Sequence, residues 1–256
     1  MEGLSNRVEG RSVQKSLMEN IEVIYESPDY IVVNKPAGLL MHKVRIKGGD
    51  TREELTLADW IAERYPEIKK VGDDPETRPG IVHRIDKNTS GVVIIARTQE
   101  YFEYLKLLFT KKIMAKKYVA LVYGEVDDNE GSIEKPIGIK SGTIKRTVYG
   151  GKMVKEALTD FKVIKRYNGY TLVEARPRTG RTHQIRVHLA SIGHPIVGDK
   201  VYGGKKEKKS PFEADRQFLH AAEIEFEAHP GELVNFSAPL PEDLENLLRN
   251  LHGANE

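Results

Sequence analysis

Short apolar runs separated by turn residues mark the start of the ordered chain. Residues 21–26 and 30–34 are rich in Ile, Val and Tyr, and the tripeptide Ser27-Pro28-Asp29 between them is typical of a tight turn. This pattern predicts an antiparallel hairpin. Residues 92–96 (VVIIA) are continuously apolar, which predicts a buried strand.

Two helices are predicted in the first half of the chain by their capping residues. Thr56 is followed three residues later by Asp59, a capping-box pattern that predicts a short helix ending before Pro66. Thr98 is expected to cap a second helix. Its apolar positions follow the three-and-four spacing of a buried helix face: Tyr101, Tyr104, Leu105, Leu108 and Phe109.

The second half of the chain reads mainly as strands. Residues 118–125, 158–164, 170–175 and 219–226 have strand character, and Asn168-Gly169 is expected to form the turn between the second and third. Two helices are also predicted here. Thr182 is expected to cap one that Gly193 terminates, and Pro241 opens another, with Leu244, Leu247, Leu248 and Leu251 on its buried stripe and Gly253 at its end.

Strands joined by short turns, with a helix at intervals, predict an α+β fold with a mixed, largely antiparallel sheet flanked by helices. The first twenty residues have no sustained periodicity, so a tail or a marginal helix is expected at 1–20. The remaining residues, 21–256, are expected to form a single catalytic domain.

Composition narrows the class of protein. The 256 residues carry 40 basic and 38 acidic side chains, a net charge of +2, so any nucleic-acid surface must be local. The absence of cysteine excludes disulfides, thiolate metal sites and cysteine nucleophiles, and favours a cytoplasmic origin. We also expect no membrane association and no export, because no apolar run approaches the ~20 residues that span a bilayer.

One carboxylate stands alone in a basic stretch. Asp86 is the only acidic residue between Thr77 and Gln99, and it lies beside Arg84 and Lys87, with His83 close by. A loop before a buried strand is a common place for a functional carboxylate. The alternative is an aspartate that ties down a turn through its own backbone, and spacing alone does not decide between the two.

A second basic segment leads into the helix predicted after Thr182. Residues 161–198 contain seven basic residues and one acid, Glu174, for a local charge of +6. Arg178 and Arg181 lie at the turn, where backbone donors and fixed charges favour phosphate binding. The five-residue spacing of His183 and His188 does not fit a metal site, so hydrogen-bonding or RNA-facing roles are favoured for them.

Lysines cluster at two further places. Lys111, Lys112, Lys116 and Lys117 precede Tyr118 and add to the basic surface, whereas the cluster in 205–209 is more typical of a solvated loop. The two Gly-Gly-Lys sequences do not have P-loop spacing, so nucleotide hydrolysis is not supported.

Five segments occur together in an order that resembles the RluA family of RNA pseudouridine synthases. They are IVVNKPAGLLMH (31–42), RPGIVHRIDKNTSG (78–91), KKYVALVYGEV (116–126), RTGRTHQIRVHLASIGHPIVGDKVYG (178–203) and LHAAEIEF (219–226). Two departures are small, since Ile85 stands where leucine is usual and Lys43 where proline is common. The resemblance is to the shorter, single-domain members, so a separate RNA-binding domain before residue 21 is not expected.

The resemblance implies a pseudouridine synthase fold and a catalytic role for three residues. Asp86 would be the catalytic aspartate, as nucleophile or as base, and Arg186 would pair with it and keep its pKa low. The Tyr118 ring would stack on the uracil and its hydroxyl would lie where proton transfer occurs, although a core-facing strand residue is the alternative. Contacts with RNA are expected from six further residues, His83, Arg84, Lys87, Arg178, Arg181 and His183.

The implied reaction needs no cofactor and no metal, because an isomerisation gains and loses no atoms. The expected partner is structured RNA, either rRNA or tRNA, with no obligate protein partner. Two other functions compete with this one. A catalytically silent RNA-binding protein of the same fold would not need Asp86, and a glycoside hydrolase or nucleosidase would normally place a second carboxylate across from the first.

Overall fold

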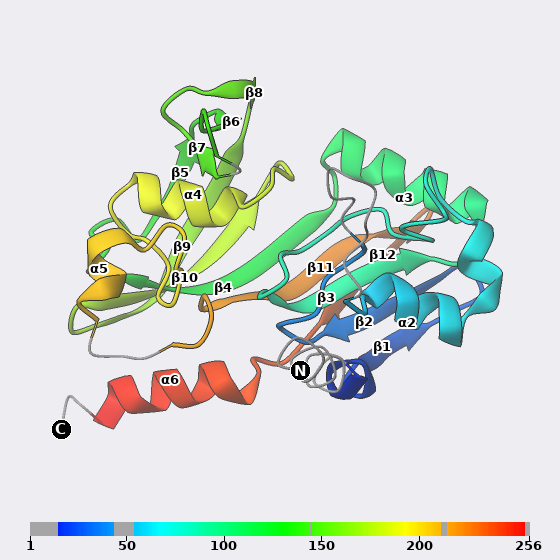
Figure 1. Cartoon of the computed structure of the whole chain (residues 1–256), viewed down its shortest axis with the longest axis horizontal. Coiled ribbons are helices and arrows are strands. Elements are labelled where there is room, and N and C mark those ends of the chain that lie inside the picture. The colour runs from blue at the N-terminus through cyan, green and yellow to red at the C-terminus, as the bar shows by residue number, and fades with distance from the viewer. Residues whose placement is uncertain (1–14, 44–53, 144, 211–213, 254–256) are drawn as a thin grey trace, which may run out of the picture. The chain divides into compact units, whose positions relative to one another are not determined.

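The computed structural model describes residues 15–43, 54–143, 145–210 and 214–253. The chain divides into two compact units (Figure 1). The first contains Met1–Met114 and Glu225–Ala238, and the second contains Ala115–Ile224 and Pro239–Glu256.

An antiparallel sheet forms the core of the first unit. Strands β1 (Glu22–Glu26), β2 (Tyr30–Lys35) and β3 (Ser90–Ala96) are neighbours in that order. Strand β12 (Glu232–Ser237) pairs with β11 (Leu219–His229), which contributes residues to both units. All seven residues of β3 are buried, as their continuous apolar run predicts.

The helices of the first unit begin at the predicted caps. In α2 (Leu57–Arg64), Thr56 and Asp59 form the complete capping box. In α3 (Gln99–Lys111), the Thr98 hydroxyl accepts the Tyr101 N–H, and the helix packs on β3. A 3₁₀ turn, η1 (Pro66–Lys70), follows α2 and was not predicted.

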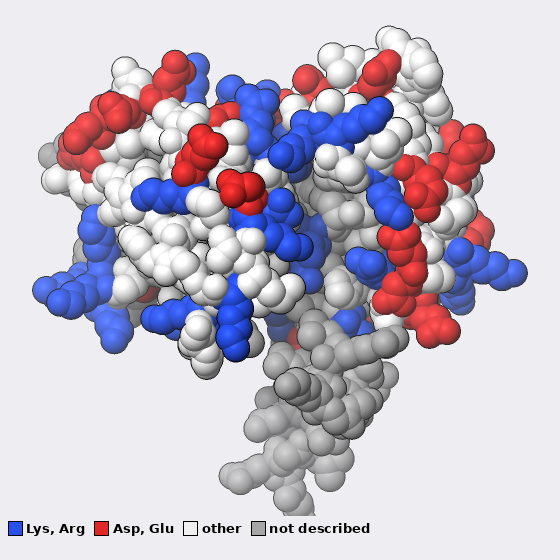
Figure 2. Space-filling model, turned by 90° about the horizontal axis from the view of Figure 1, so that it is seen from above, with Lys and Arg blue, Asp and Glu red and all other residues white. Residues whose placement is uncertain are grey.

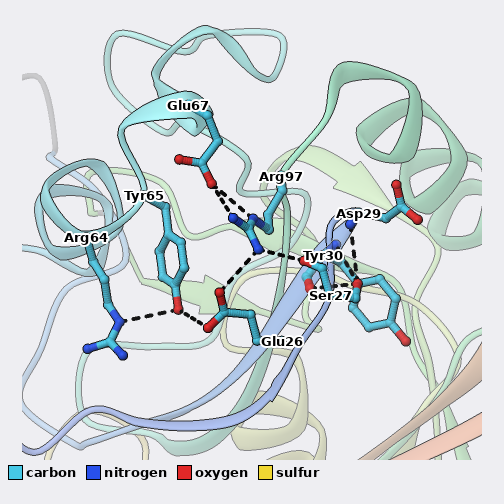
Figure 3. Close-up of polar contacts among 8 residues, drawn as sticks. All are labelled: Glu26, Ser27, Asp29, Tyr30, Arg64, Tyr65, Glu67 and Arg97. Atoms are coloured by element: carbon cyan, nitrogen blue, oxygen red, sulfur yellow. Dashed lines mark hydrogen bonds and ion pairs between the residues drawn. The ribbon is translucent and has the colours of Figure 1, made fainter.

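Arg97 fixes the end of β3 against the hairpin turn (Figure 3). Its Nη1 donates to the Ser27 carbonyl at 2.8 Å and to Glu26, while Nη2 donates to Glu67 at 2.6 Å. The Ser27 hydroxyl accepts the N–H groups of Asp29 and Tyr30, which shapes the turn. The predicted hairpin is therefore confirmed.

The main sheet of the second unit is also antiparallel. Its strands are β4 (Ala115–Tyr123), β10 (Tyr170–Pro177), β9 (Leu158–Tyr167) and β5 (Glu130–Glu134), in that order. The predicted turn joins β9 to β10, and Gly169 adopts a left-handed φ of 76° there. The strand predicted at 118–125 is β4, and it ends at Tyr123. It ends there because Gly124 has a φ of 85°, which the strand conformation does not allow.

A second, smaller sheet lies within this unit. It consists of β7 (Arg146–Thr147), β6 (Ile137–Ile139) and β8 (Lys152–Lys155), in that order and antiparallel. None of these short strands was predicted.

The described part of the second unit also contains the helices α4 (Gln184–Ser191), α5 (Gly204–Lys208) and α6 (Glu242–Gly253). Leu244 and Leu251 of α6 are buried in the core, as the predicted stripe requires. The cap predicted at Thr182 is wrong by one residue, because His183 is the N-cap of α4 and forms no side-chain capping bond.

The α+β fold with a largely antiparallel sheet and flanking helices is confirmed. Residues 15–19 are helical, whereas the rest of the predicted tail, 1–14, lies outside the described residues. The assignment of 21–256 to one catalytic domain stays a prediction. No helix in the described part of the chain is long and apolar enough to cross a membrane.

Candidate active site

Asp86 lies on a loop that leads into the buried strand β3 of the first unit. The Thr89 N–H donates to the Asp86 carbonyl at 3.1 Å, so the loop turns tightly after the aspartate. Asp86 is partly buried, whereas Arg84, Lys87 and Asn88 are exposed. The loop therefore presents one carboxylate with cationic neighbours, as the sequence predicted.

A fully buried lysine holds this loop. Lys35 has no exposed surface, and its Nζ donates to the carbonyls of Pro36, Leu39 and Lys87 at 2.7, 2.9 and 3.1 Å. The Lys87 carbonyl also accepts the Gly38 N–H. Because the buried ammonium is matched by three carbonyls, it joins the end of β2 to the residue after Asp86. Sequence reasoning assigned no role to Lys35.

His83 fixes the preceding part of the loop. Its Nε2 accepts the Ile94 N–H at 3.0 Å, and its ring stacks on Phe109 with centroids 4.8 Å apart. These contacts give His83 a structural role, and its predicted contact with RNA stays a prediction. Lys87 forms a 2.8 Å ion pair with Glu54, and Arg84 is exposed.

Arg186 of α4 forms a buried, bidentate ion pair with Asp199 in the second unit. Nε donates to Oδ2 at 2.7 Å and Nη2 to Oδ1 at 2.9 Å. The two side chains are 6% and 0% exposed, respectively. The same Oδ1 accepts the N–H groups of Val201 and Tyr202, so the carboxylate is itself fixed. Sequence reasoning missed Asp199, although it lies within the fourth quoted motif.

Tyr202 connects this ion pair to neighbouring segments. The Arg186 guanidinium lies 5.2 Å from the centre of the Tyr202 ring. The Tyr202 hydroxyl is 2.9 Å from Nδ1 of His183 and accepts the Arg146 N–H at 2.9 Å. His183 has a φ of 58°, a left-handed conformation unusual for a non-glycine residue. His183 therefore helps to position Tyr202 beneath Arg186.

Gln184 organises the turn before α4. Its Oε1 accepts the Arg181 N–H and the Thr179 hydroxyl, and its Nε2 donates to the Leu158 carbonyl at 2.9 Å. The two arginines of the turn also have partners, since Arg178 pairs with Asp160 and Arg181 donates to the Glu156 carbonyl. The predicted cluster of cations is present, although acceptors of this unit compensate part of its charge.

Tyr118 and Lys116 point to the same face of β4, because they are two residues apart on a strand. Both are partly buried, and Tyr118 lies opposite Ala175 of β10. Desolvation lowers the pKa of Lys116 to about 8. Lys117 points to the other face and forms a 2.6 Å ion pair with Glu223, which raises its pKa.

His188 is a structural residue of the core. Its Nδ1 lies 3.0 Å from the Thr159 hydroxyl and its Nε2 lies 2.9 Å from the Lys135 carbonyl. Burial lowers its pKa, and the carbonyl partner requires a proton on Nε2. The predicted hydrogen-bonding role is confirmed. Among the described residues, no group of three or more His, Asp or Glu side chains has the arrangement of a metal site.

The predicted site residues thus fall into two groups. His83, Arg84, Asp86 and Lys87 share one loop of the first unit, while the second unit contains the others: Tyr118, Arg178, Arg181, His183 and Arg186. Within the second unit, the structure links His183 to Arg186 through Tyr202.

Comparisons with known proteins identify the family of the chain. A profile of the family described as RNA pseudouridylate synthase matches residues 29–191. The chain is 38% identical over 236 residues to "Uncharacterized RNA pseudouridine synthase YlyB" of Bacillus subtilis (strain 168), covering 91% of this chain and 73% of that protein. It is 35% identical to "Ribosomal large subunit pseudouridine synthase D" of Nitrosomonas europaea, covering 90% of this chain and 64% of that protein.

Solved structures are similar over nearly the whole chain. "Human RNA Pseudouridylate Synthase Domain Containing 1" matches with a TM-score of 0.69 and 26% identity, covering 92% of this chain and 96% of that one. "Human RNA Pseudouridylate Synthase Domain Containing 4" matches with a TM-score of 0.71 at 22% identity, which indicates a shared fold.

Proposed function

Because this chain belongs to the RNA pseudouridylate synthase family and is an isomerase of the RluA type, we propose that it converts specific uridines of structured RNA into pseudouridine. The observation that carries the proposal is the loop of Asp86, a carboxylate among cations on a segment fixed by the buried Lys35. Relatives named as synthases of the large ribosomal subunit favour rRNA over tRNA as the substrate.

The reaction breaks the bond between the ribose C1′ and the uracil N1, turns the base, and forms a bond from C1′ to C5. The proton lost from C5 returns to N1, so the atoms balance without an oxidant, a nucleotide or a metal. Asp86 either attacks the ribose or removes a proton from it, and both roles need the ionised carboxylate.

The other two catalytic residues in the proposal belong to the second unit. Arg186 pairs with Asp86 and favours its ionised form. Tyr118 stacks on the uracil, and its hydroxyl relays the C5 proton by accepting it as it gives up its own.

Binding requires the target nucleotide to leave its stack, because the reactive atoms are hidden in a duplex or a stacked loop. In this proposal Arg84 occupies the gap left by the base. His83, Lys87, Arg178, Arg181 and His183 bind the phosphates or sugars around it.

The test is to map pseudouridine in total RNA from cells with and without the gene. We expect one or a few sites to disappear on deletion and to return with the wild-type gene, but not with Asp86→Asn. An unchanged pseudouridine map after deletion would refute the proposed activity in the cell.

A further inference from the structure

The small sheet β6–β8 carries a strong local charge. Residues 137–155 contain five basic residues and no acidic one: Lys140, Lys145, Arg146, Lys152 and Lys155. The whole chain has a net charge of only +2, so this segment, like residues 161–198, is locally basic. A uniform positive charge of this kind favours a polyanionic partner.

Apolar side chains are exposed on this sheet and in the loop between β7 and β8, which contains Tyr149. Tyr149 is 84% exposed, Met153 72% and Val154 49%, and every residue of β8 is exposed. In Figure 1 the three strands lie at the top of the second unit, and Figure 2, seen from above, shows Lys and Arg side chains beside uncharged surface on its left, with Asp and Glu side chains among them. An exposed aromatic ring among cations is the combination that binds unpaired nucleotides.

The sheet has a defined local structure. A Cβ on Gly151 would lie 2.4 Å from the Ile139 carbonyl oxygen, and one on Gly138 would lie 2.8 Å from the Gly150 carbonyl oxygen, so the strands approach closely through glycine. The Tyr149 N–H donates to the Thr147 hydroxyl at 3.0 Å. These contacts fix the backbone that presents the Tyr149 ring.

Arg146 provides the most specific observation. Its Nε is buried and has no hydrogen-bond partner within the part of the chain that the structure describes. Buried donors in proteins are nearly always satisfied, and a phosphate oxygen is a strong acceptor for a guanidinium. The backbone N–H of the same residue binds the Tyr202 hydroxyl, which places the sheet next to the Arg186 network.

We propose that the β6–β8 sheet is an RNA-contact surface, on which Tyr149 stacks on an unpaired base while Arg146 and Lys152 bind phosphates. The proposal rests on the proposed function, since it assigns this surface to the same RNA substrate. An acidic protein could match the charges, but it would neither need a stacking platform nor discriminate between single-stranded and duplex nucleic acid.

The test uses a fluorescein-labelled, ten-nucleotide RNA without uridine, both as a single strand and as a duplex, so that binding is measured without turnover. We expect Tyr149→Ala to weaken single-strand binding by about 5- to 150-fold and to leave duplex binding unchanged. Tyr149→Trp should restore the affinity. Leu233→Ala, which removes another exposed apolar side chain, serves as the control.

The charges are tested by salt dependence. The double substitution Arg146→Gln with Lys152→Gln should reduce the log–log salt slope for the single strand by about 1.4, or 0.7 for each lost phosphate contact. The pair Lys205→Gln with Lys208→Gln removes equal charge from exposed positions of α5 and should leave the slope unchanged.

Wild-type affinity in Tyr149→Ala together with an unchanged slope in the double variant would overturn the proposal. The two proposals fail separately. Wild-type protein that binds RNA through Tyr149 but forms no pseudouridine would refute the proposed function alone. If the protein forms pseudouridine but these substitutions do not change its RNA binding, only the proposed RNA-contact surface is refuted.

Discussion

Asp199 holds Arg186 in a single orientation. Two parallel hydrogen bonds of 2.7 and 2.9 Å join the carboxylate to Nε and Nη2, and both side chains are buried. Two backbone N–H groups fix the carboxylate in turn. A bidentate pair of this kind determines the plane of the guanidinium as well as its position, so Asp199 is a positioning residue for the proposed catalytic arginine.

Replacing Asp199 by Asn should destabilise the protein strongly. The change keeps the shape of the side chain but removes the negative charge that binds Nε and Nη2 of the buried Arg186, and breaking a buried pair in this way costs about 3–5 kcal/mol. Glu174→Gln removes one partner of the more exposed pair with Arg176 and should cost at most about 1 kcal/mol. Urea unfolding of both variants measures the difference, and equal losses would contradict the role of Asp199.

Arg186→Lys should lower turnover more than RNA affinity. Lysine keeps the charge but cannot make a bidentate contact with Asp199 while pairing with Asp86. Loss of one charge-assisted hydrogen bond, about 1.5–3 kcal/mol, corresponds to a rate about 10- to 150-fold slower at saturating RNA. Lys111→Ala and Lys112→Ala should instead weaken binding and reduce the salt slope while single-turnover rates stay normal. If Arg186→Lys behaves like these lysine variants, its proposed pairing with Asp86 is wrong.

Lys35→Met should impair catalysis without weakening RNA binding. The buried ammonium donates to three carbonyls, of which that of Lys87 belongs to the Asp86 loop, and leaving buried acceptors unsatisfied costs about 1–3 kcal/mol. We expect a lower unfolding free energy and slower single turnover at unchanged affinity. Lys69→Met, at an exposed position of η1, is the matched control. Normal turnover in Lys35→Met would show that the loop does not need this lysine.

RNA binding should weaken as the pH rises from 7 to 9. Desolvation lowers the pKa of Lys116 to about 8, so its side chain is charged below this pH and neutral above it. If Lys116 contacts a phosphate, the log–log salt slope should decrease by about 0.7 over this range. Lys116→Gln should abolish the change.

The control for this experiment is the next residue of the strand. Lys117 has a raised pKa because it pairs with Glu223, so Lys117→Gln should keep the pH dependence. The measurement is the RNA affinity of the wild type and of both variants at pH 7, 8 and 9. If the RNA affinity of Lys116→Gln falls between pH 7 and 9 as much as that of the wild type, Lys116 is not the source of the pH dependence.

Local rules predicted the parts of the fold that depend on neighbouring residues. The turn at Ser27 and the caps at Thr56 and Thr98 were found because each is fixed within four residues of sequence. The strands of the small sheet have two to four residues and depend on close approach at Gly138 and Gly151. Their pairing is a tertiary effect, so periodicity gave no signal for it.

The candidate site shows the same division. Asp86 and its cationic neighbours are adjacent in sequence and could be predicted, whereas the partners of the arginines could not. The basic segment 161–198 begins one residue after Asp160 and ends one residue before Asp199. These two carboxylates pair with Arg178 and Arg186, respectively. Lys35 was missed because lysine is rarely buried, and because one of its three carbonyl partners, that of Lys87, lies 52 residues away in the sequence.

The most direct test of the central claim is a paired measurement on Asp86→Asn, of pseudouridine formed in a single turnover and of affinity for the RNA identified by mapping. We predict that the variant forms no pseudouridine and binds RNA at least as tightly as the wild type, because removing a negative charge does not weaken contacts with phosphates. Substantial pseudouridine formation by Asp86→Asn would contradict the assignment of Asp86 as the catalytic carboxylate.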